Sequence, residues 1–517
     1  MINIDGNALA IKDIVKVAFE NEKVSISELG RKRILDSNAK LLKIIKKGNP
    51  VYGVNTGFGI FANKVISEKD NEKLNRNLII SHAVGTGEPL PKEIVRAAVL
   101  IRANALTKGY SGVRLEIVQI LLDMLNADLN PVISAKGSLG SSGDLCMLAQ
   151  MALVLTRGEE ENESESGFAV FAGERFSGFK AMQKAGIERL CLSQKEGLAL
   201  INGATFSAAV LALCIEKAEF LCDLADLADS LSLEALVGRS EPFHPELHLA
   251  RGLAGQIESA KNISRFILGS TLVNSHAHVQ DAYSLRCSPQ VHGAVRDTLG
   301  FVKKIIESEI NAATDNPLIV EEDKIISGGN FHGEPVGMSA DFLSIALSEL
   351  AAISERRVFR LMDKNLNFGL KEMLVDSESV DGLNSGLMML QYTAASLVLE
   401  NQTLSSPDSV RSLPTSANQE DHNANAFTAA IHTWQIVENL TRVLAIELFT
   451  SCRAIEQRLK AQPEQKLGVI TGKAFELIIN HFPYRADDSL WRDDMEKLYS
   501  FLLSPSEFQN KIRSMHD

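Results

Sequence analysis

The sequence lacks an excess of positive charge. It holds 53 lysines and arginines against 65 aspartates and glutamates, and its formal net charge at pH 7 is −12. A surface that binds nucleic acid or anionic lipid concentrates lysine and arginine. The composition therefore argues against both partners, and we expect neither nucleic acid nor a membrane to bind this chain.

Cysteine pairs and targeting signals are also missing. The six cysteines are widely spread and form no CxxC pair, which is typical of reduced, mostly buried thiols. The first six residues show no basic stretch followed by an apolar one, so no signal peptide is expected. No uncharged apolar run reaches membrane-spanning length. These absences predict a cytoplasmic protein.

No alternating strand pattern, internal repeat or low-complexity linker was found. Helical periodicity is present instead. Shorter helices are expected at Glu93–Thr107, Val113–Asn126 and Asp144–Leu155, and long ones at Ala204–Val237, Met338–Phe368, Leu387–Ser406 and Asn423–Ala461. The last has an apolar face formed by Phe427, Ile431, Trp434, Val437, Leu440, Leu444 and Leu448.

A chain of 517 residues exceeds one ordinary core, so we expect two or three packed units. The predicted fold class is mainly α, with an elongated central bundle of long helices and a loop-rich N-terminal domain. We place the N-terminal domain at residues 1–200 and the long-helix domain at residues 201–517.

Residues 137–145 read GSLGSSGDL and are unusually rich in small side chains. They do not form a P-loop, because no Gly-Lys-Ser/Thr follows, and their GxxGxxG spacing differs from the GxGxxG of dinucleotide sites. A GxSxG nucleophile elbow is absent as well. Taken alone, such a segment is most often a flexible connector.

Two further segments carry candidate catalytic side chains. Residues 51–59 read VYGVNTGFG, and their three glycines suggest either a mobile loop that carries Tyr52 to a site or a surface turn with a packed tyrosine. Residues 280–290 read QDAYSLRCSPQ. Their Tyr283 and Arg286, three residues apart, could serve a substrate or form a structural pair at a helix end.

Together these segments resemble the aromatic amino acid ammonia-lyases, the histidase and phenylalanine ammonia-lyase family. Residues 51–59 match the YGxNTGFG motif, and residues 280–290 match QDPYSLRCxPQ with Ala282 in place of proline. Ser141 stands where the family usually has alanine, and residues 146–150 read CMLAQ where histidases more often read APLAH. The resemblance covers Tyr52 to about His422 and implies an L-aspartase/fumarase-like helical fold.

The resemblance implies a prosthetic group made from the chain itself. In the family the tripeptide cyclises to 4-methylidene-imidazole-5-one (MIO). Here the Gly143 nitrogen would attack the carbonyl of Ser141, and Ser142 would lose its hydroxyl as water. Ring closure uses the carbonyl of Ser141, so a serine side chain is compatible there. No external cofactor is implied, and the expected assembly is a homotetramer whose active sites are shared between subunits.

The resemblance also assigns roles to single residues. Tyr52 is catalytic, Tyr283 removes the β-proton and must ionise near neutral pH to do so, and Arg286 binds the substrate carboxylate through its bidentate donors. Asn202 and Gln280 line the prosthetic group and substrate, with Phe331 at the ring. Outside this family, such amides would more often be buried hydrogen-bonders and such a phenylalanine a core residue.

The predicted substrate is L-histidine, with urocanate as product. His82, in the pair Ser81-His82, falls where histidases have it, and Met388 matches the histidase pocket. Glu420 stands where phenylalanine-selective relatives have glutamine; a carboxylate is costly against a phenyl ring but pairs with an imidazole N–H. A helix-start carboxylate remains the alternative for Glu420.

Other functions stay open. An aminomutase or a lyase for another aromatic amino acid would use the same electrophile, and a catalytically silent homologue would fit Ser141 and the CMLAQ segment. The close histidines of residues 244–248 and 276–278 raise a metal site, but HExxH and a carboxylate cluster are absent. We expect no metal.

Overall fold

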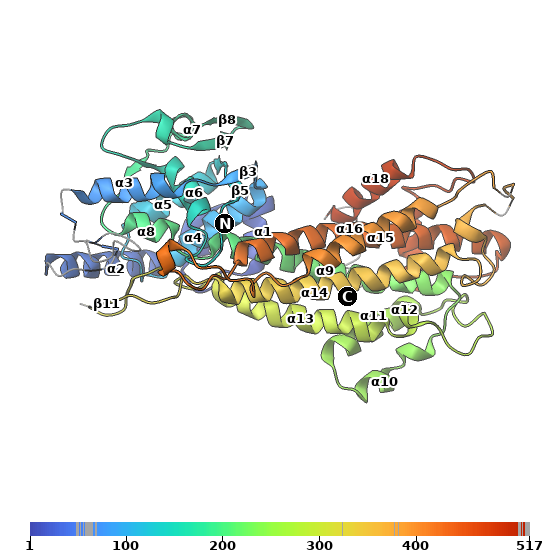
Figure 1. Ribbon diagram of the computed structural model, residues 1–517. Coiled ribbons are helices and arrows are strands. Elements are labelled where there is room, and N and C mark those ends of the chain that lie inside the picture. The colour runs from blue at the N-terminus through green and yellow to red at the C-terminus, as the bar shows by residue number, and fades with distance from the viewer. Residues whose placement is uncertain are drawn as a thin grey trace. The chain divides into compact units, whose positions relative to one another are not determined.

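The computed structural model describes residues 1–47, 51, 53–54, 56, 66–67, 70–322, 324–376, 378–380, 382–504, 508 and 510–511. Helices make up 59% of the structure, and the strands are two to four residues long. The predicted mainly α fold is confirmed (Figure 1). Tyr52 lies outside the described residues.

The chain forms two compact units. The first comprises residues 1–216, 302–341 and 407–434, and the second comprises residues 217–301, 342–406 and 435–517. Four helices contribute residues to both units: α9 (Thr205–Ala235), α13 (Ser288–Glu309), α14 (Glu334–Met362) and α16 (Ala426–Ala461). The sequence-based division at residue 200 remains a prediction.

The first unit packs short helices around α4 (Lys92–Thr107), which is buried from Ile94 to its end and contacts α1 and α5. Its other helices are α1 (Ile11–Phe19), α2 (Glu28–Lys46), α3 (Asn71–His82), α5 (Leu115–Asn126), α6 (Leu145–Leu155), α7 (Gly178–Ala185) and α8 (Glu196–Ile201). The helices predicted at Glu93, Val113 and Asp144 therefore form within two residues of their expected starts.

Small sheets complete the first unit. β1 (Ile2–Ile4) and β2 (Val24–Ile26) pair in parallel, and β4 (Asn130–Pro131), β7 (Phe168–Phe171) and β8 (Glu174–Ser177) form an antiparallel sheet. Further pairs are β3 (Thr86–Pro89) with β5 (Ser134–Lys136), β6 (Thr156–Arg157) with β9 (Leu190–Cys191), and β10 (Leu318–Ile319) with β11 (Ile325–Ile326). Such short strands cannot establish an alternating sequence pattern.

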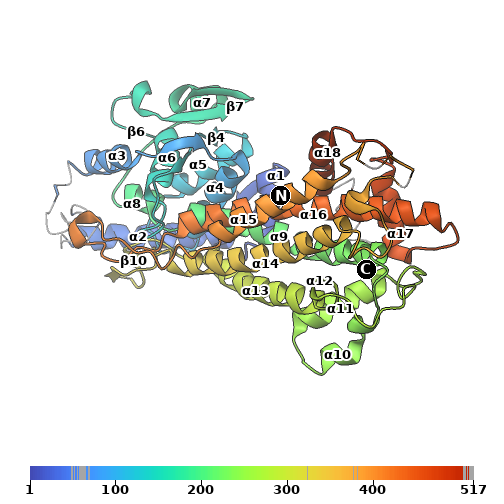
Figure 2. The same ribbon diagram turned by 45° about the vertical axis from the view of Figure 1, so that its right-hand side comes forward.

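The second unit is a bundle in which α13, α14 and α16 run side by side in Figures 1 and 2. Its further helices are α10 (Pro245–Leu249), α11 (Ala254–Phe266), α12 (Tyr283–Arg286), α15 (Met388–Leu404), α17 (Val469–Ile479) and α18 (Trp491–Leu503). The predicted apolar face of α16 packs inward: Phe427, Val437, Leu440, Leu444 and Leu448 are buried, while Ile431 and Trp434 are half-buried. A buried ion cluster joins Arg357 on α14 to Glu447 on α16.

Helix α14 ends earlier than its sequence predicted. The expected helix ran to Phe368, but α14 stops at Met362, and Asp363 then begins a turn. The Asp363 carboxylate accepts a hydrogen bond from the Asn365 N–H at 2.8 Å, and Phe368 adopts a left-handed φ of 55°. Aspartate and asparagine compete with the helix for backbone hydrogen bonds, which ends it.

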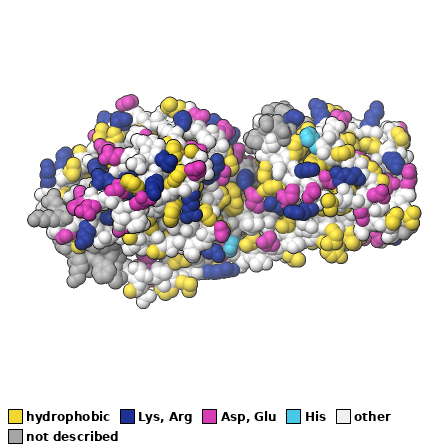
Figure 3. All heavy atoms as spheres, turned by 90° about the horizontal axis from the view of Figure 1, so that it is seen from above, with side chains coloured by type: hydrophobic (Ala, Val, Ile, Leu, Met, Phe, Trp, Pro, Cys, Tyr) yellow, Lys and Arg dark blue, Asp and Glu magenta, His cyan; other side chains and the backbone are white. Residues whose placement is uncertain are grey.

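The six cysteines are free thiols, and four of them are buried. α14 is long and apolar enough to cross a membrane by length and composition, yet 61% of its apolar window is buried, as in the core helix of a folded protein. On the face shown in Figure 3, lysine and arginine side chains are interspersed with acidic and hydrophobic ones.

Candidate active site

The segment predicted to cyclise is held against the turn that follows α8. Asp144 N–H donates to the Gly203 carbonyl at 2.9 Å, and Gly203 N–H donates to the Ser142 carbonyl at 3.3 Å. Gly143 has φ 82°, and a Cβ built there would lie 2.0 Å from the Gly203 carbonyl carbon. Only glycine fits this position, because both the conformation and the contact exclude a side chain.

The backbone at Gly143 fits the chemistry of cyclisation. Among the described residues, none accepts a hydrogen bond from the Gly143 N–H. An unengaged amide nitrogen is available to attack a carbonyl, whereas a bonded one would first have to lose its partner. The Ser142 oxygen, which becomes the ring carbonyl in the family's group, already faces the Gly203 N–H.

Asp144 connects this loop to helix α9 through hydrogen bonds of its carboxylate. Its carboxylate is fully buried and accepts hydrogen bonds from the Ser138 hydroxyl at 2.7 Å and the Ser207 N–H at 2.8 Å. Burial raises the pKa of Asp144 above its ordinary value, while these hydrogen bonds oppose the rise. The carboxylate thus ties the loop to the first turn of α9.

Asn202 is buried at the end of α8 and is held by its neighbours. Its side-chain amide donates to the Asn316 carbonyl at 3.3 Å, and its own carbonyl accepts a hydrogen bond from the Arg102 guanidinium. Burial lowers the pKa of Arg102 to about 10. Lys195 and Asp315 form an ion pair in which both side chains are fully buried. Asp315 directly precedes Asn316 in the sequence.

Sequence reasoning missed this support. Arg102 and Lys195 sit in helical or turn segments whose sequences give no sign of a buried charge, and their partners are about a hundred residues away. Asp144 could have been found, since it directly follows the glycine-rich motif.

Glu420 lies in a short antiparallel turn. Thr415 N–H donates to the Glu420 carbonyl at 2.8 Å, and the Thr415 hydroxyl donates to the Glu420 carboxylate at 3.1 Å. The carboxylate is half-buried and precedes α16 by six residues, so it is not a capping group of that helix. This placement leaves it able to accept a further hydrogen bond.

His82 and Phe331 also belong to the first unit, and both are half-buried. His82 is the last residue of α3, and its Nδ1–H donates to the Leu78 carbonyl at 2.8 Å. This bond leaves the Nε2 of a neutral ring as an acceptor. Phe331 lies in the loop before α14.

Tyr283 and Arg286 form the single turn α12 in the second unit. The Arg286 guanidinium carbon lies 4.6 Å from the centre of the Tyr283 ring, and its Nε donates to the Asp281 carbonyl at 2.9 Å. Among the described residues, neither terminal nitrogen of Arg286 has a hydrogen-bond partner. Those two donors can receive a carboxylate, and Tyr283 is 70% exposed beside them.

A buried cluster fixes this turn to the bundle. The Ser288 hydroxyl donates to Asp229 at 2.6 Å, and Arg357 donates to the Ser284 carbonyl at 3.2 Å. Burial raises the pKa of Asp229 to about 7, against the opposing effect of Arg357. The turn that carries Tyr283 and Arg286 is therefore hydrogen-bonded to buried charged residues of the second unit.

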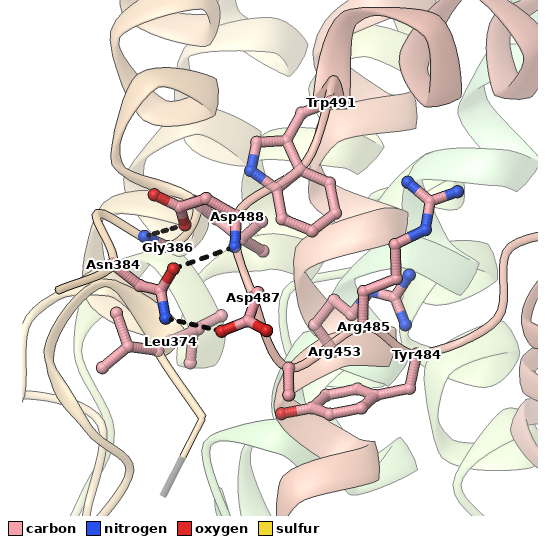
Figure 4. Close-up of a pocket in the computed structure, with 12 residues that line it drawn as sticks. Leu374, Asn384, Gly386, Arg453, Tyr484, Arg485, Asp487, Asp488 and Trp491 are labelled. Carbon is pink, nitrogen blue, oxygen red and sulfur yellow. Dashed lines mark hydrogen bonds between the residues drawn. The ribbon is translucent and has the colours of Figure 1, made fainter. Parts of the chain in front are cut away.

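Gln280 and Met388 are the remaining candidates of the second unit. The Gln280 side chain is exposed just before α12, and Met388 is the first residue of α15. The chain entering α15 is held by Asp488, whose carboxylate accepts a hydrogen bond from Ser385 N–H at 2.7 Å. It accepts a second one from Gly386 N–H at 2.8 Å (Figure 4). A small pocket lies here, bordered by Leu374, Arg453, Tyr484 and Trp491.

The histidines weighed as metal ligands have protein partners. His278 Nε2–H donates to Asp281 at 2.7 Å, and its ring stacks on Phe368. His248 bonds the Pro242 carbonyl and Gln256. Within the part of the chain that the structure describes, no three His, Cys, Asp or Glu side chains are arranged to hold a metal ion.

Comparison with known proteins supports the family resemblance independently of the site's geometry. The family model for aromatic amino acid lyases matches residues 9–479, which extends the resemblance beyond both ends of its motifs. The histidine ammonia-lyase of Caldanaerobacter subterraneus subsp. tengcongensis is 51% identical over 459 residues, and the match covers 88% of each chain.

Two solved structures share the fold. The histidine ammonia-lyase of Trypanosoma cruzi has a TM-score of 0.89 at 35% identity, with 99% of this chain and 95% of that chain covered. The tyrosine aminomutase of Streptomyces globisporus has a TM-score of 0.91 at 31% identity, with 99% and 98% covered. The fold alone therefore does not separate a lyase from an aminomutase.

Proposed function

This chain belongs to the aromatic amino acid lyase family, and from that membership we propose that it is a histidine ammonia-lyase, which converts L-histidine to urocanate and ammonia. The observation that carries the proposal is the geometry of the 141–143 tripeptide. Gly143 tolerates no side chain, its N–H has no acceptor among the residues that the structure describes, and the Ser142 carbonyl accepts a hydrogen bond from Gly203.

We propose that this tripeptide forms the MIO group without any external cofactor. The Gly143 nitrogen bonds to the carbonyl carbon of Ser141, and the Ser141 oxygen leaves as water with the amide protons of Gly143 and Ser142. Ser142 then loses its α-proton and its hydroxyl as a second water, which leaves a methylene. The finished group would supply an electrophile for the substrate amine, which is otherwise a poor leaving group.

The chain's own side chains do the rest. Arg286 binds the substrate carboxylate through its two terminal nitrogens, which have no hydrogen-bond partner among the described residues. Tyr283 takes the β-proton, and Tyr52 is the second catalytic tyrosine of the proposal. Asn202 and Gln280 hydrogen-bond the substrate and prosthetic group, with Phe331 at the ring.

Selectivity for histidine rests on Glu420, with His82 and Met388 completing the pocket. An imidazole N–H satisfies the Glu420 carboxylate, whereas a phenyl ring would leave it desolvated without a partner. The relative from Caldanaerobacter, which is named a histidine ammonia-lyase, supports this choice.

We propose that the protein is a cytoplasmic homotetramer whose active sites are shared between subunits. Residues 1–200 carry the prosthetic group, and residues 201–517 carry substrate and subunit contacts. Exposed apolar side chains support assembly, among them Phe301, Phe342, Ile345 and Leu399 on or beside the long helices. Light scattering should give a tetramer, and an active monomer at working concentration would contradict this assembly.

Product analysis tests the proposed function. The purified protein is given L-histidine, L-phenylalanine and L-tyrosine separately, and ammonia, the unsaturated acid and any β-amino acid are quantified. The proposal expects urocanate and ammonia in equal amounts, with L-histidine having the highest kcat/KM. A β-amino acid as the main product would assign the chain to the aminomutases, in line with its similarity to tyrosine aminomutase.

A further inference from the structure

The hydroxyl of Ser141 makes two hydrogen bonds that the alanine usual in this family cannot make. Its oxygen accepts a hydrogen bond from the Ala424 N–H at 2.9 Å, and its proton is donated to the Leu139 carbonyl at 3.1 Å. Ser141 is 5% exposed and Ala424 is fully buried. The contact joins parts of the chain 283 residues apart.

Ala424 ends the segment that carries Glu420, residues 411–424. The tip of this segment is conformationally unfavourable, because Ser416, Ala417 and Asn418 have left-handed φ angles of 50°, 53° and 66°. Side chains other than glycine rarely adopt such angles, and three in a row persist only where contacts at the base hold them.

Contacts at the base of segment 411–424 are of two kinds. Some tie it to itself, as when Asn423 N–H donates to the Ser412 hydroxyl at 2.7 Å. Others tie it to neighbouring loops. His332 donates to the His422 carbonyl at 3.1 Å, and Ser141 binds Ala424. The Ser141 contact connects the segment to the tripeptide proposed to form the prosthetic group.

The backbone segments around the Ser141–Ala424 contact are packed too closely to admit a side chain at Gly140 or Gly333. A Cβ built on Gly140 would lie 2.7 Å from the Ala426 nitrogen, and one built on Gly333 would lie 2.0 Å from the Gly140 carbonyl oxygen. The backbone segments at Gly140, Gly333 and Ala426 thus approach one another so closely that only glycine fits at positions 140 and 333. A hydrogen bond placed there fixes the register of one stretch against the other.

We propose that the Ser141 hydroxyl is a positioning group that fixes the Glu420 segment against the prosthetic tripeptide and so sharpens selectivity for a substrate with an imidazole N–H. This role rests on the proposed function, because it needs Glu420 to contact the substrate. The Ser141 carbonyl takes part in the proposed ring formation, whereas its hydroxyl reaches the Glu420 segment through Ala424 and bonds the Leu139 carbonyl within its own loop.

The test compares Ser141→Ala with the parent in the full-length protein. The variant should still lose two waters, since ring closure uses only the carbonyl. Its kcat/KM for histidine should fall roughly fivefold, mainly through KM, because of the two bonds lost only the buried neutral one from Ala424 N–H holds the Glu420 segment. The preference for histidine over phenylalanine should fall as well, and hydrogen exchange at the Ala424 amide should accelerate by a similar factor.

Two further variants separate this role from packing. Ser141→Cys has a similar size but is a weak acceptor, so it should behave like Ser141→Ala. Ser37→Ala is the matched control, because buried Ser37 likewise accepts a backbone N–H, from Gly112 at 3.0 Å, in a segment without a site candidate. It should leave KM and the Ala424 exchange rate unchanged.

A double-mutant cycle with Glu420→Gln gives the sharpest outcome. If Ser141 acts through Glu420, the combined variant should lose less than the product of the two single losses. Unchanged KM, selectivity and Ala424 exchange in Ser141→Ala would overturn the positioning role while leaving histidine turnover by the parent intact. Loss of the two-water deficit in Ser141→Ala would also overturn it, by placing Ser141 in ring formation. A parent without histidine turnover would remove the proposed function itself.

Discussion

Replacing Glu420 with glutamine is the most direct perturbation of substrate choice. The amide has nearly the same shape as the carboxylate and can still accept the hydrogen bond that Thr415 donates at 3.1 Å. The change therefore leaves the local turn in place and removes the negative charge. What is lost is the charge-assisted hydrogen bond to the imidazole N–H of the substrate.

The magnitude follows from that exchange. A hydrogen bond to a charged group contributes about 1.5–3 kcal/mol and a neutral one about 1 kcal/mol. Glu420 is half-buried, so solvent weakens its charge only in part. We expect a loss of about 1.5 kcal/mol, which corresponds to roughly tenfold in kcat/KM for histidine.

The assay follows urocanate by its ultraviolet absorbance and measures kcat/KM for histidine, phenylalanine and tyrosine in parent and variant. Phenylalanine should be used equally well or better by Glu420→Gln, because its ring no longer faces a desolvated carboxylate. Asp421→Asn removes the same charge from the neighbouring exposed side chain and should change little. A parent that prefers phenylalanine, or a Glu420→Gln variant with unchanged histidine turnover, would refute this reasoning.

Two further predictions concern the loop and the bundle. In Gly203→Ala the new Cβ would lie 2.5 Å from the Thr314 hydroxyl oxygen, at a φ of 113°. The hydrogen bond from residue 203 to Ser142 should therefore shift, and intact-mass measurement should show that only part of the chains lose two waters. Complete water loss with full activity would contradict this prediction. Asp229→Asn tests the buried cluster. Burial raises the Asp229 pKa from 3.8 to about 7, so the stability that this carboxyl gives is present at low pH and lost as the pH rises through about 7. The variant's Tm should therefore rise relative to the parent's between about pH 4 and about pH 7, as the parent loses at most about 4 kcal/mol of stability, and a constant Tm difference over this range would show that Asp229 keeps an ordinary pKa.

Much of the fold could be predicted because long helices repeat their apolar positions many times. The face of α16 is the clearest case, with Leu440, Leu444 and Leu448 at four-residue steps and all buried. The early end of α14 was not predicted, since residues 363–368 contain neither the glycine nor the proline that usually marks a helix end. Their turn depends on the Asp363 carboxylate, which periodicity does not detect.

The site was partly predictable for a similar reason. Glycines at 140, 143 and 203 are visible in the sequence, and each has a left-handed φ where a Cβ would clash. The contacts that hold them are invisible there, because Ser141 meets Ala424 and Asp144 meets Ser207 only in the folded chain. Side-chain type can indicate chemistry, but partners far apart in sequence follow only from packing.

The intact mass of the purified, denatured protein tests most directly whether the chain makes its own electrophile. Cyclisation of Ser141-Ser142-Gly143 predicts a mass lower than that of the sequence by two waters. Ser142→Ala, which keeps the fold but has no hydroxyl to lose, should abolish this loss and nearly all turnover. An unmodified mass in protein that turns over histidine would contradict the mechanism.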